Sequence, residues 1–151
     1  MTLKTEYRNE AVFFSIFDTP DGLVYCSGVN IERFLPITRG RHKSMSNPAI
    51  RGLQLVNLEI RSIALGEGAE TETGRFGECS GLTPPDEFWY TESLFIKNAP
   101  DGFSDRVIEY AVVNLLKKID KAIMLNAGMP EKLLPPESLM EFINELCRRF
   151  G

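Results

Sequence analysis

Histidine and cysteine are scarce in this chain, and their scarcity excludes the commonest metal sites. His42 is the only histidine, so one chain has neither an HExxH zinc site nor a multi-histidine metal centre. The three cysteines, Cys26, Cys79 and Cys147, are odd in number and widely spaced, which argues against both a disulfide scaffold and a cysteine zinc cluster. We therefore predict three free thiols, no bound metal and no cofactor.

Long apolar runs are also missing. No run approaches the roughly 20 apolar residues that span a bilayer, and the N-terminal stretch MTLKTEYRNE contains no apolar signal core. We therefore expect a cytoplasmic protein with no membrane partner. The 151 residues, 43% hydrophobic and 25% charged, are typical of a globular protein, so residues 1–151 are expected to form a single domain.

Catalytic signatures are the third absence. Residues 38–44, TRGRHKS, superficially resemble a phosphate-binding loop, but the second glycine that should directly precede Lys43 is missing. Cys79 follows Glu78, whose negative charge disfavours a reactive thiolate. No catalytic residue is therefore predicted, and the sequence favours a protein that is not an enzyme.

The clearest pattern that is present predicts an amphipathic helix over residues 104–126. Its apolar residues recur at steps of three and four, which places them on one side of a helix. A second helix is predicted over residues 48–65, where Asn47 and Pro48 form a cap and a first turn and Gly66 follows the last apolar residue. Both apolar sides need a sheet or another helix to cover them.

Two segments near the N-terminus have the composition of a β-hairpin. Residues 11–17 and 23–29 are rich in β-branched and aromatic residues, and Pro20 and Gly22 lie in the turn between them. Gly22 is expected to adopt a positive φ.

The remaining elements complete the expected fold. Residues 31–37 are predicted to form a short edge strand, residues 88–97 a further strand and residues 136–149 a third helix. This order predicts an α+β domain with a small antiparallel sheet of three to five strands and about three helices packed mainly on one face.

Charge is unevenly distributed along the chain. Residues 31–51 hold five basic residues against Glu32 alone, whereas residues 66–92 hold seven acidic residues against Arg75 alone. Five glycines and two prolines within residues 66–87 predict a long acidic loop. The net charge of −4 argues against a protein that mainly binds nucleic acid.

Two hypotheses for the function follow from these charges. The first is a non-enzymatic binding protein, an adaptor, inhibitor or regulator, that contacts a basic protein partner through the acidic loop and the neighbouring aromatic strand. Its candidate contact residues are Glu67, Glu70, Glu72, Glu78 and Trp89. The alternative is a small-molecule sensor or enzyme that binds a phosphorylated or nucleotide-like anion at the basic segment 38–51, because guanidinium, ammonium and helix N–H groups suit an anion. Its candidate ligand-binding residues are Arg39, Arg41, His42, Lys43, Ser44 and Arg51.

Three leucines raise the question of assembly. Leu55, Leu58 and Leu65 lie off the main apolar side of the 48–65 helix, and each contributes roughly 1.5–3 kcal/mol when it is fully buried. Either the C-terminal helix of the same chain or a second copy in a homodimer would cover them.

Overall fold

The computed structural model describes residues 2–34, 47–73 and 89–127. The first described elements are β1 (Thr2–Arg8), β2 (Val12–Thr19), β3 (Gly22–Asn30) and the 3-10 turn η1 (Ile31–Phe34). They are followed by α2 (Pro48–Gly66), β4 (Glu70–Thr73), β5 (Trp89–Lys97) and α3 (Phe103–Ala127).

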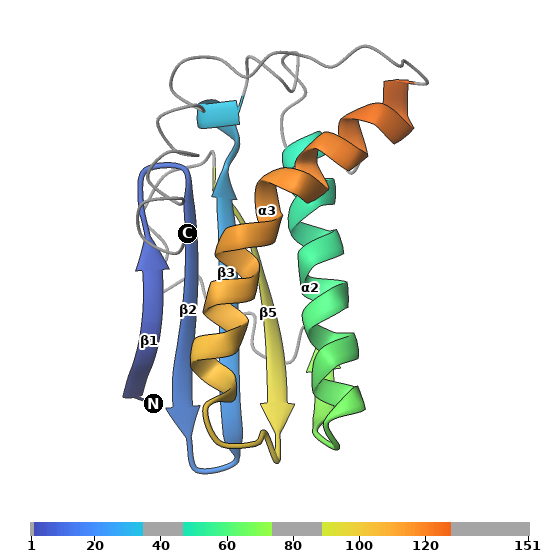
Figure 1. Ribbon diagram of the computed structural model, residues 1–151. Helices are drawn as coiled ribbons and strands as arrows, with labels where there is room; N and C mark the ends of the chain where they lie inside the picture. The colour runs from blue at the N-terminus through green and yellow to red at the C-terminus, as the bar shows by residue number, and fades with distance from the viewer. Residues whose placement is uncertain (1, 35–46, 74–88, 128–151) are drawn as a thin grey trace.

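The five strands form one antiparallel sheet in the order β1-β2-β3-β5-β4 (Figure 1). The predicted hairpin is confirmed as β2 and β3, which are in register from Val12 opposite Val29 to Thr19 opposite Gly22. The φ of Gly22 is 156°, and a Cβ at this position would lie 2.6 Å from the carbonyl oxygen of Ile96 on β5. Glycine at this corner therefore lets the hairpin lie directly against its neighbouring strand.

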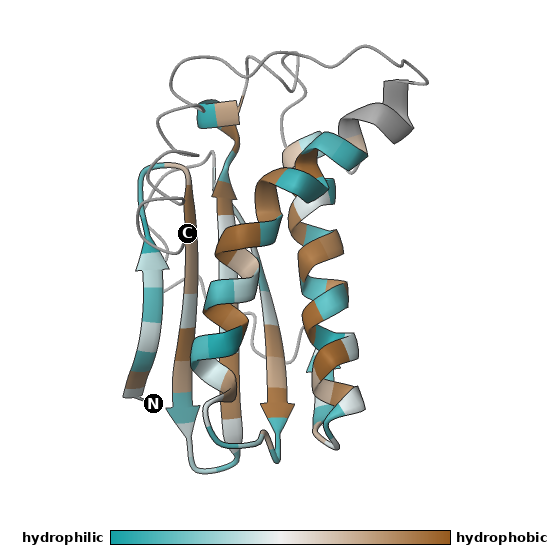
Figure 2. Cartoon of the chain, in the orientation of Figure 1, coloured by the Kyte–Doolittle hydropathy of each residue, from teal (hydrophilic) through white to brown (hydrophobic). Residues whose placement is uncertain are grey.

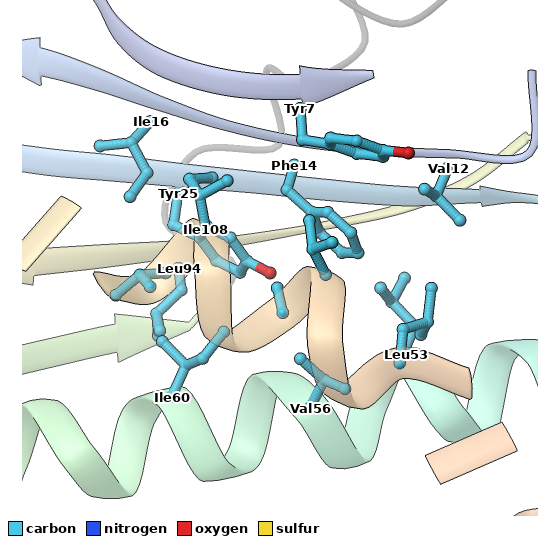
Figure 3. Close-up of a cluster of buried hydrophobic side chains, with 14 of the residues drawn as sticks. Tyr7, Val12, Phe14, Ile16, Tyr25, Leu53, Val56, Ile60, Leu94 and Ile108 are labelled. Carbon is cyan, nitrogen blue, oxygen red and sulfur yellow. The ribbon is translucent and has the colours of Figure 1, made fainter. Parts of the chain in front are cut away.

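Helices α2 and α3 lie side by side on one face of the sheet (Figure 1). Figure 3 shows Tyr7, Phe14 and Tyr25 projecting from the strands into the layer where Leu53 and Ile60 of α2 point. All five side chains are at most 1% exposed. The main core therefore lies between the sheet and the two helices, as the two amphipathic patterns predict.

The two helices meet closely at Gly52. A Cβ at this position would lie 2.5 Å from Cγ1 of Ile119 and 2.8 Å from the backbone nitrogen of the same residue. Glycine thus allows α2 to approach the backbone of α3 at a distance that any side chain would prevent.

A second apolar cluster lies on the opposite face of the sheet. Its members are Phe13, Phe17, Val24, Cys26, Trp89 and Phe95, and each is at most 9% exposed, although both described helices pack on the other face. Gly28 makes room for the ring of Phe13, since a Cβ there would lie 2.4 Å from Cε1 of that ring. The Phe13 ring reaches Trp89, with 5.5 Å between the two ring centroids.

The observed fold agrees with the predicted class, with five antiparallel strands and two helices among the described residues. The helices predicted over residues 48–65 and 104–126 are confirmed, and so is the strand at residues 88–97, which the structure describes from Trp89. The predicted helix at residues 136–149 lies outside the described residues. In the part of the chain that is described, no helix has the length and apolar character needed to cross a membrane.

Three segments differ from the sequence prediction. Residues 2–8 form a strand that their mixed charged sequence does not predict, because pairing with β2 fixes them. Residues 31–34 form a 3-10 turn instead of an edge strand, since Oδ1 of Asn30 accepts the N–H of Glu32 at 3.0 Å. The prediction of a loop over 66–87 is wrong for residues 70–73, which pair with β5 as β4.

Candidate functional site

A polar cluster lies between α2 and the sheet, beside the main apolar core. Asn57 of α2 joins two strands in this cluster, because its Nδ2 donates to Oγ of Ser27 on β3 at 3.0 Å and to Oε1 of Glu92 on β5 at 3.1 Å. The Ser27 hydroxyl also donates to Oδ1 of Asn57 at 3.4 Å. One amide side chain therefore connects the helix to two neighbouring strands.

Tyr90 and Glu92 extend this cluster along β5. The Tyr90 hydroxyl donates to Oε2 of Glu92 at 2.5 Å and accepts from Nε2 of Gln54 at 3.3 Å. Burial, the hydrogen bond to Glu92 and the negative charge of that carboxylate together raise the pKa of Tyr90 to about 12, while the hydrogen bond from Gln54 acts to lower it. Tyr90 is therefore a neutral donor at physiological pH.

Tyr25 adds a buried hydroxyl at the inner side of the cluster. Its side chain is fully buried, and its hydroxyl has no hydrogen-bond partner in the described structure. Burial raises the pKa of the Tyr25 hydroxyl, the neighbouring Ser27 side chain lowers this pKa, and the negative charge of Glu92 raises it. Tyr25 therefore remains neutral, and its ring contributes to the core.

Two further polar contacts hold α2 along its flanks. Nε of Arg61 donates to Oγ1 of Thr71 on β4 at 3.0 Å, and Glu59 forms an ion pair with Lys118 of α3. Together with Asn57, these contacts tie one flank of α2 to the sheet and the other flank to α3. They fix the rotation of α2 about its own axis, and this rotation decides which residues face outward.

The outward side of α2 carries a regular apolar seam, which we call the leucine face. It consists of Arg51, Leu55, Leu58, Ser62 and Leu65, at steps of four, three, four and three residues. Leu58 is 59% exposed and Leu65 is 52% exposed, while Leu55 is half-buried. Hydrophobic residues recur along α2 in Figure 2. The leucine face has one charge, at its Arg51 end.

The outward side of α3 differs from that of α2 in its charge. Among the described side chains of α3, the exposed ones are Asp105, Arg106, Glu109, Val113, Lys117, Asp120 and Lys121, so all of them except Val113 are charged. The two helices lie in the same layer, yet only α2 presents leucines where α3 presents charges of both signs. Isolated exposed apolar residues are ordinary, but a seam of three leucines at helical spacing suits a contact surface.

No protein-family model, curated protein or solved structure matches this chain. The function is therefore inferred from the geometry of the chain itself. Within the described ranges, no group of three or more histidine, cysteine or acidic residues is arranged to hold a metal ion.

The predicted anion site falls mostly outside the described residues. Arg39, Arg41, His42, Lys43 and Ser44 all lie there, whereas Arg51 is exposed in the first turns of α2. Just before it, Oδ1 of Asn47 accepts the N–H of Ala49 at 2.8 Å and that of Ile50 at 3.4 Å. The predicted cap at Asn47 is thus confirmed, and anion binding by the segment 38–51 stays a prediction.

The predicted partner residues are placed on different surfaces. Glu67 is paired with Arg106 of α3 at 2.8 Å, and Glu70 and Glu72 lie on β4 at the edge of the sheet. Glu78 lies outside the described residues. Trp89 does not form an exposed aromatic surface, because it packs on Phe13 and is 9% exposed.

The structure corrects the expectation that the cysteines are all free thiols. Cys26 is disulfide-bonded and lies in the apolar cluster on the second face of the sheet. Cys79 and Cys147 lie outside the described residues. Spacing along the sequence did not reveal this bond, because a disulfide depends on distance in the fold.

Proposed function

We propose that this chain is a non-enzymatic protein-binding domain that contacts its partner through the leucine face of α2. The observation that carries this proposal is the contrast between the two helices of one layer. The outward side of α3 is charged, whereas that of α2 presents Leu55, Leu58 and Leu65. This proposal moves the contact from the acidic segment, where Glu67 is already neutralised by Arg106, to the exposed helix.

Covering the leucine face stabilises a complex appreciably. Full burial of a leucine contributes roughly 1.5–3 kcal/mol. Leu58 and Leu65 still expose 59% and 52% of their surface, so covering these two side chains contributes about 2–3 kcal/mol before the entropy of association is subtracted. The few side chains that dominate a protein–protein interface typically contribute free energies of this size.

The spacing of the leucine face suits a helical partner. Steps of four and three residues have the period of 3.5 that lets two helices pack along a shared seam. Of the two residues that flank the seam, Glu59 forms an ion pair with Lys118, whereas Arg61 donates to the neutral hydroxyl of Thr71 and keeps its positive charge. A partner helix therefore meets the apolar seam with the positive charge of Arg61 beside it.

A pair of matched variants tests this proposal. Leu58→Glu places a charge in the centre of the leucine face, and Val113→Glu places the same charge at an exposed apolar residue of α3, which is 41% exposed. Both variants should fold, because both positions face solvent. Proteins captured from lysate by the tagged full chain should be retained by Val113→Glu and lost from Leu58→Glu, as quantified by mass spectrometry. Equal capture by both variants would remove α2 as the contact surface.

The proposal includes the expected cytoplasmic location. The disulfide at Cys26 is the observation that weighs against it, because structural disulfides persist mainly in oxidising compartments. Fractionation of cells that express the full chain, combined with alkylation of free thiols before lysis, measures both the location and the redox state of Cys26. Recovery in a secreted or periplasmic fraction would contradict the cytoplasmic part.

A further inference from the structure

We propose that the partner of the leucine face is an acidic amphipathic helix, whose carboxylates meet Arg51 and Arg61 while its apolar side covers the leucines. This inference rests on the proposed function, because it uses the same surface. It goes further by stating the charge of the partner and the two side chains that recognise it.

The charge that α2 leaves unpaired is entirely positive. This helix contains three charged residues, Arg51, Glu59 and Arg61, and the acidic one forms an ion pair with Lys118 of α3. No described residue forms an ion pair with Arg51 or Arg61. The leucine face is therefore accompanied by two guanidinium groups, and its own helix supplies no unpaired carboxylate to neutralise them.

Arg61 lies beside the two exposed leucines. It follows Leu58 by three residues and precedes Leu65 by four, and side chains at these spacings are neighbours on the surface of a helix. A helix that covers both leucines therefore brings one of its own flanks against Arg61. A basic residue on that flank would meet a like charge, whereas glutamate or aspartate would form an ion pair.

The guanidinium group of Arg61 retains donors for such a carboxylate. Its Nε donates to Oγ1 of Thr71 at 3.0 Å, and its two terminal nitrogens carry further N–H groups. A carboxylate can accept parallel hydrogen bonds from a guanidinium group. The bond to Thr71 also holds Arg61 in place before a partner arrives, which reduces the entropy lost on binding.

The acidic side chains of β4 are directed away from Arg61. Thr71 lies between Glu70 and Glu72 in the sequence of this strand, and successive residues of a strand point to opposite faces of the sheet. Glu72 is opposite Phe95 of β5, which belongs to the apolar cluster on the other face. The positive charge of Arg61 therefore remains for a partner.

Arg51 defines the spacing of the acidic residues in the partner. It lies ten residues before Arg61, which corresponds to about 15 Å along the helix axis. The partner helix should accordingly carry acidic residues about three turns apart. Apolar residues at steps of three and four should lie between them.

A protein helix suits this surface better than a membrane does. Helices that lie on membranes combine a broad apolar face with many basic residues. The outward side of α2 instead has one narrow seam, in which Leu55 is half-buried, and two basic residues.

Fluorescence anisotropy with two synthetic peptides tests the proposal on the full chain. Both peptides carry leucines at steps of three and four residues, and the flanking positions hold glutamate in one peptide and lysine in the other. The acidic peptide should bind the wild type about tenfold more tightly than the basic peptide at low ionic strength, and added salt should reduce this preference. Equal or tighter binding of the basic peptide, or no binding of either peptide, would overturn the inference.

Three variants assign the preference to the charge of Arg61. Arg61→Glu should remove it, whereas Lys117→Glu makes the same change of charge on the exposed side of α3 and should retain it. Thr71→Val removes the acceptor of Arg61 but keeps the positive charge, so it should also retain the preference. Circular dichroism and the urea midpoint show whether each variant is folded. A preference that survives in folded Arg61→Glu, or that Lys117→Glu removes equally, would overturn the role of Arg61.

The outcome for the proposed function is separate. Partners that are lost from Leu58→Glu, together with equal binding of the two peptides, would overturn the acidic partner but support the protein-binding surface. Capture that Leu58→Glu leaves unchanged would overturn the proposed function. Sedimentation with vesicles rich in phosphatidylserine distinguishes a membrane. Vesicle binding that Leu58→Glu abolishes, without any preference between the peptides, would assign the leucine face to a lipid surface and overturn both proposals.

Discussion

Replacing Gly52 by alanine should destabilise the protein because α2 and α3 meet closely at this residue. The added Cβ would lie 2.5 Å from Cγ1 of Ile119, 2.8 Å from its backbone nitrogen and 3.0 Å from its Cα. Two of these three atoms belong to the backbone of α3, so rotation of a side chain does not relieve the contact. The helices have to move apart.

Two effects of opposite sign determine the size of this change. Alanine in place of glycine stabilises a helix interior by roughly 1 kcal/mol, while forcing an extra group into a packed interior costs roughly 1–3 kcal/mol. The backbone contacts place Gly52 at the upper end of that range, so we expect Gly52→Ala to lower the free energy of unfolding by about 1–2 kcal/mol. For a chain of this length, such a loss lowers the Tm by roughly 2–8 °C.

Gly66 provides a matched control on the same helix. It lies at the last residue of α2, and nothing lies within 4 Å of a Cβ built on it. Gly66→Ala should therefore be neutral or slightly stabilising. Urea unfolding followed by circular dichroism gives both free energies, and a Gly52→Ala variant as stable as Gly66→Ala would refute the reasoning about close helix packing.

Three further predictions concern single contacts. Gly28→Ala should be less costly in a Phe13→Leu background than in the wild type, with a coupling energy of about 1 kcal/mol or more from urea unfolding, because its Cβ would meet the Phe13 ring; additive effects would contradict this. The pKa of Tyr90 is raised from its ordinary value of 10.0 to about 12, so its contribution to stability is complete below about pH 10 and is lost as the pH rises through about 12. Tyr90→Phe should accordingly reduce the fall in urea midpoint between about pH 10 and about pH 12, and an unchanged fall would contradict this. Asn47→Ala should lower the free energy of unfolding by about 1–2 kcal/mol and Asn47→Ser by less, because the serine hydroxyl still caps α2; equal losses would indicate that capping is not the role of this side chain.

The helices could be predicted because local pattern and tertiary burial agree in them. Val107, Leu115 and Ile119 recur at helical spacing and are all at most 3% exposed in α3. In α2, the cap at Asn47 and the first-turn proline mark the start that the structure confirms. Elements of this kind depend mainly on residues that are close in sequence.

The polar cluster could not be predicted from the same information. Ser27, Asn57 and Glu92 lie on three separate elements and meet only after β5 has paired with β3. Each is a common polar residue with no distinctive neighbours in the sequence. Strand β4 was missed for a related reason, because ETET has weak strand composition and is fixed by its pairing with β5.

The sequence alone could not show whether the leucine face is exposed. Leu55, Leu58 and Leu65 could be recognised as lying off the buried side, but whether another part of the chain covered them depended on the fold. The structure shows that Leu58 and Leu65 are exposed.

The position of β5 in the sheet has a consequence for how the chain acquires its structure over time. Strands β1, β2 and β3 are joined to their neighbours by short connections and pair in the order of the sequence, so they can assemble as soon as they are synthesised. Strand β4 precedes β5 in the chain, yet among the described strands it pairs with β5 alone. Strand β4 can therefore pair only after β5 has been synthesised. Strand β5 inserts between β3 and β4, and its pairing with β3 closes a loop that contains the whole of α2. Insertion of β5 thus joins β1, β2 and β3 to β4, and we expect this long-range pairing to be the slowest step of folding.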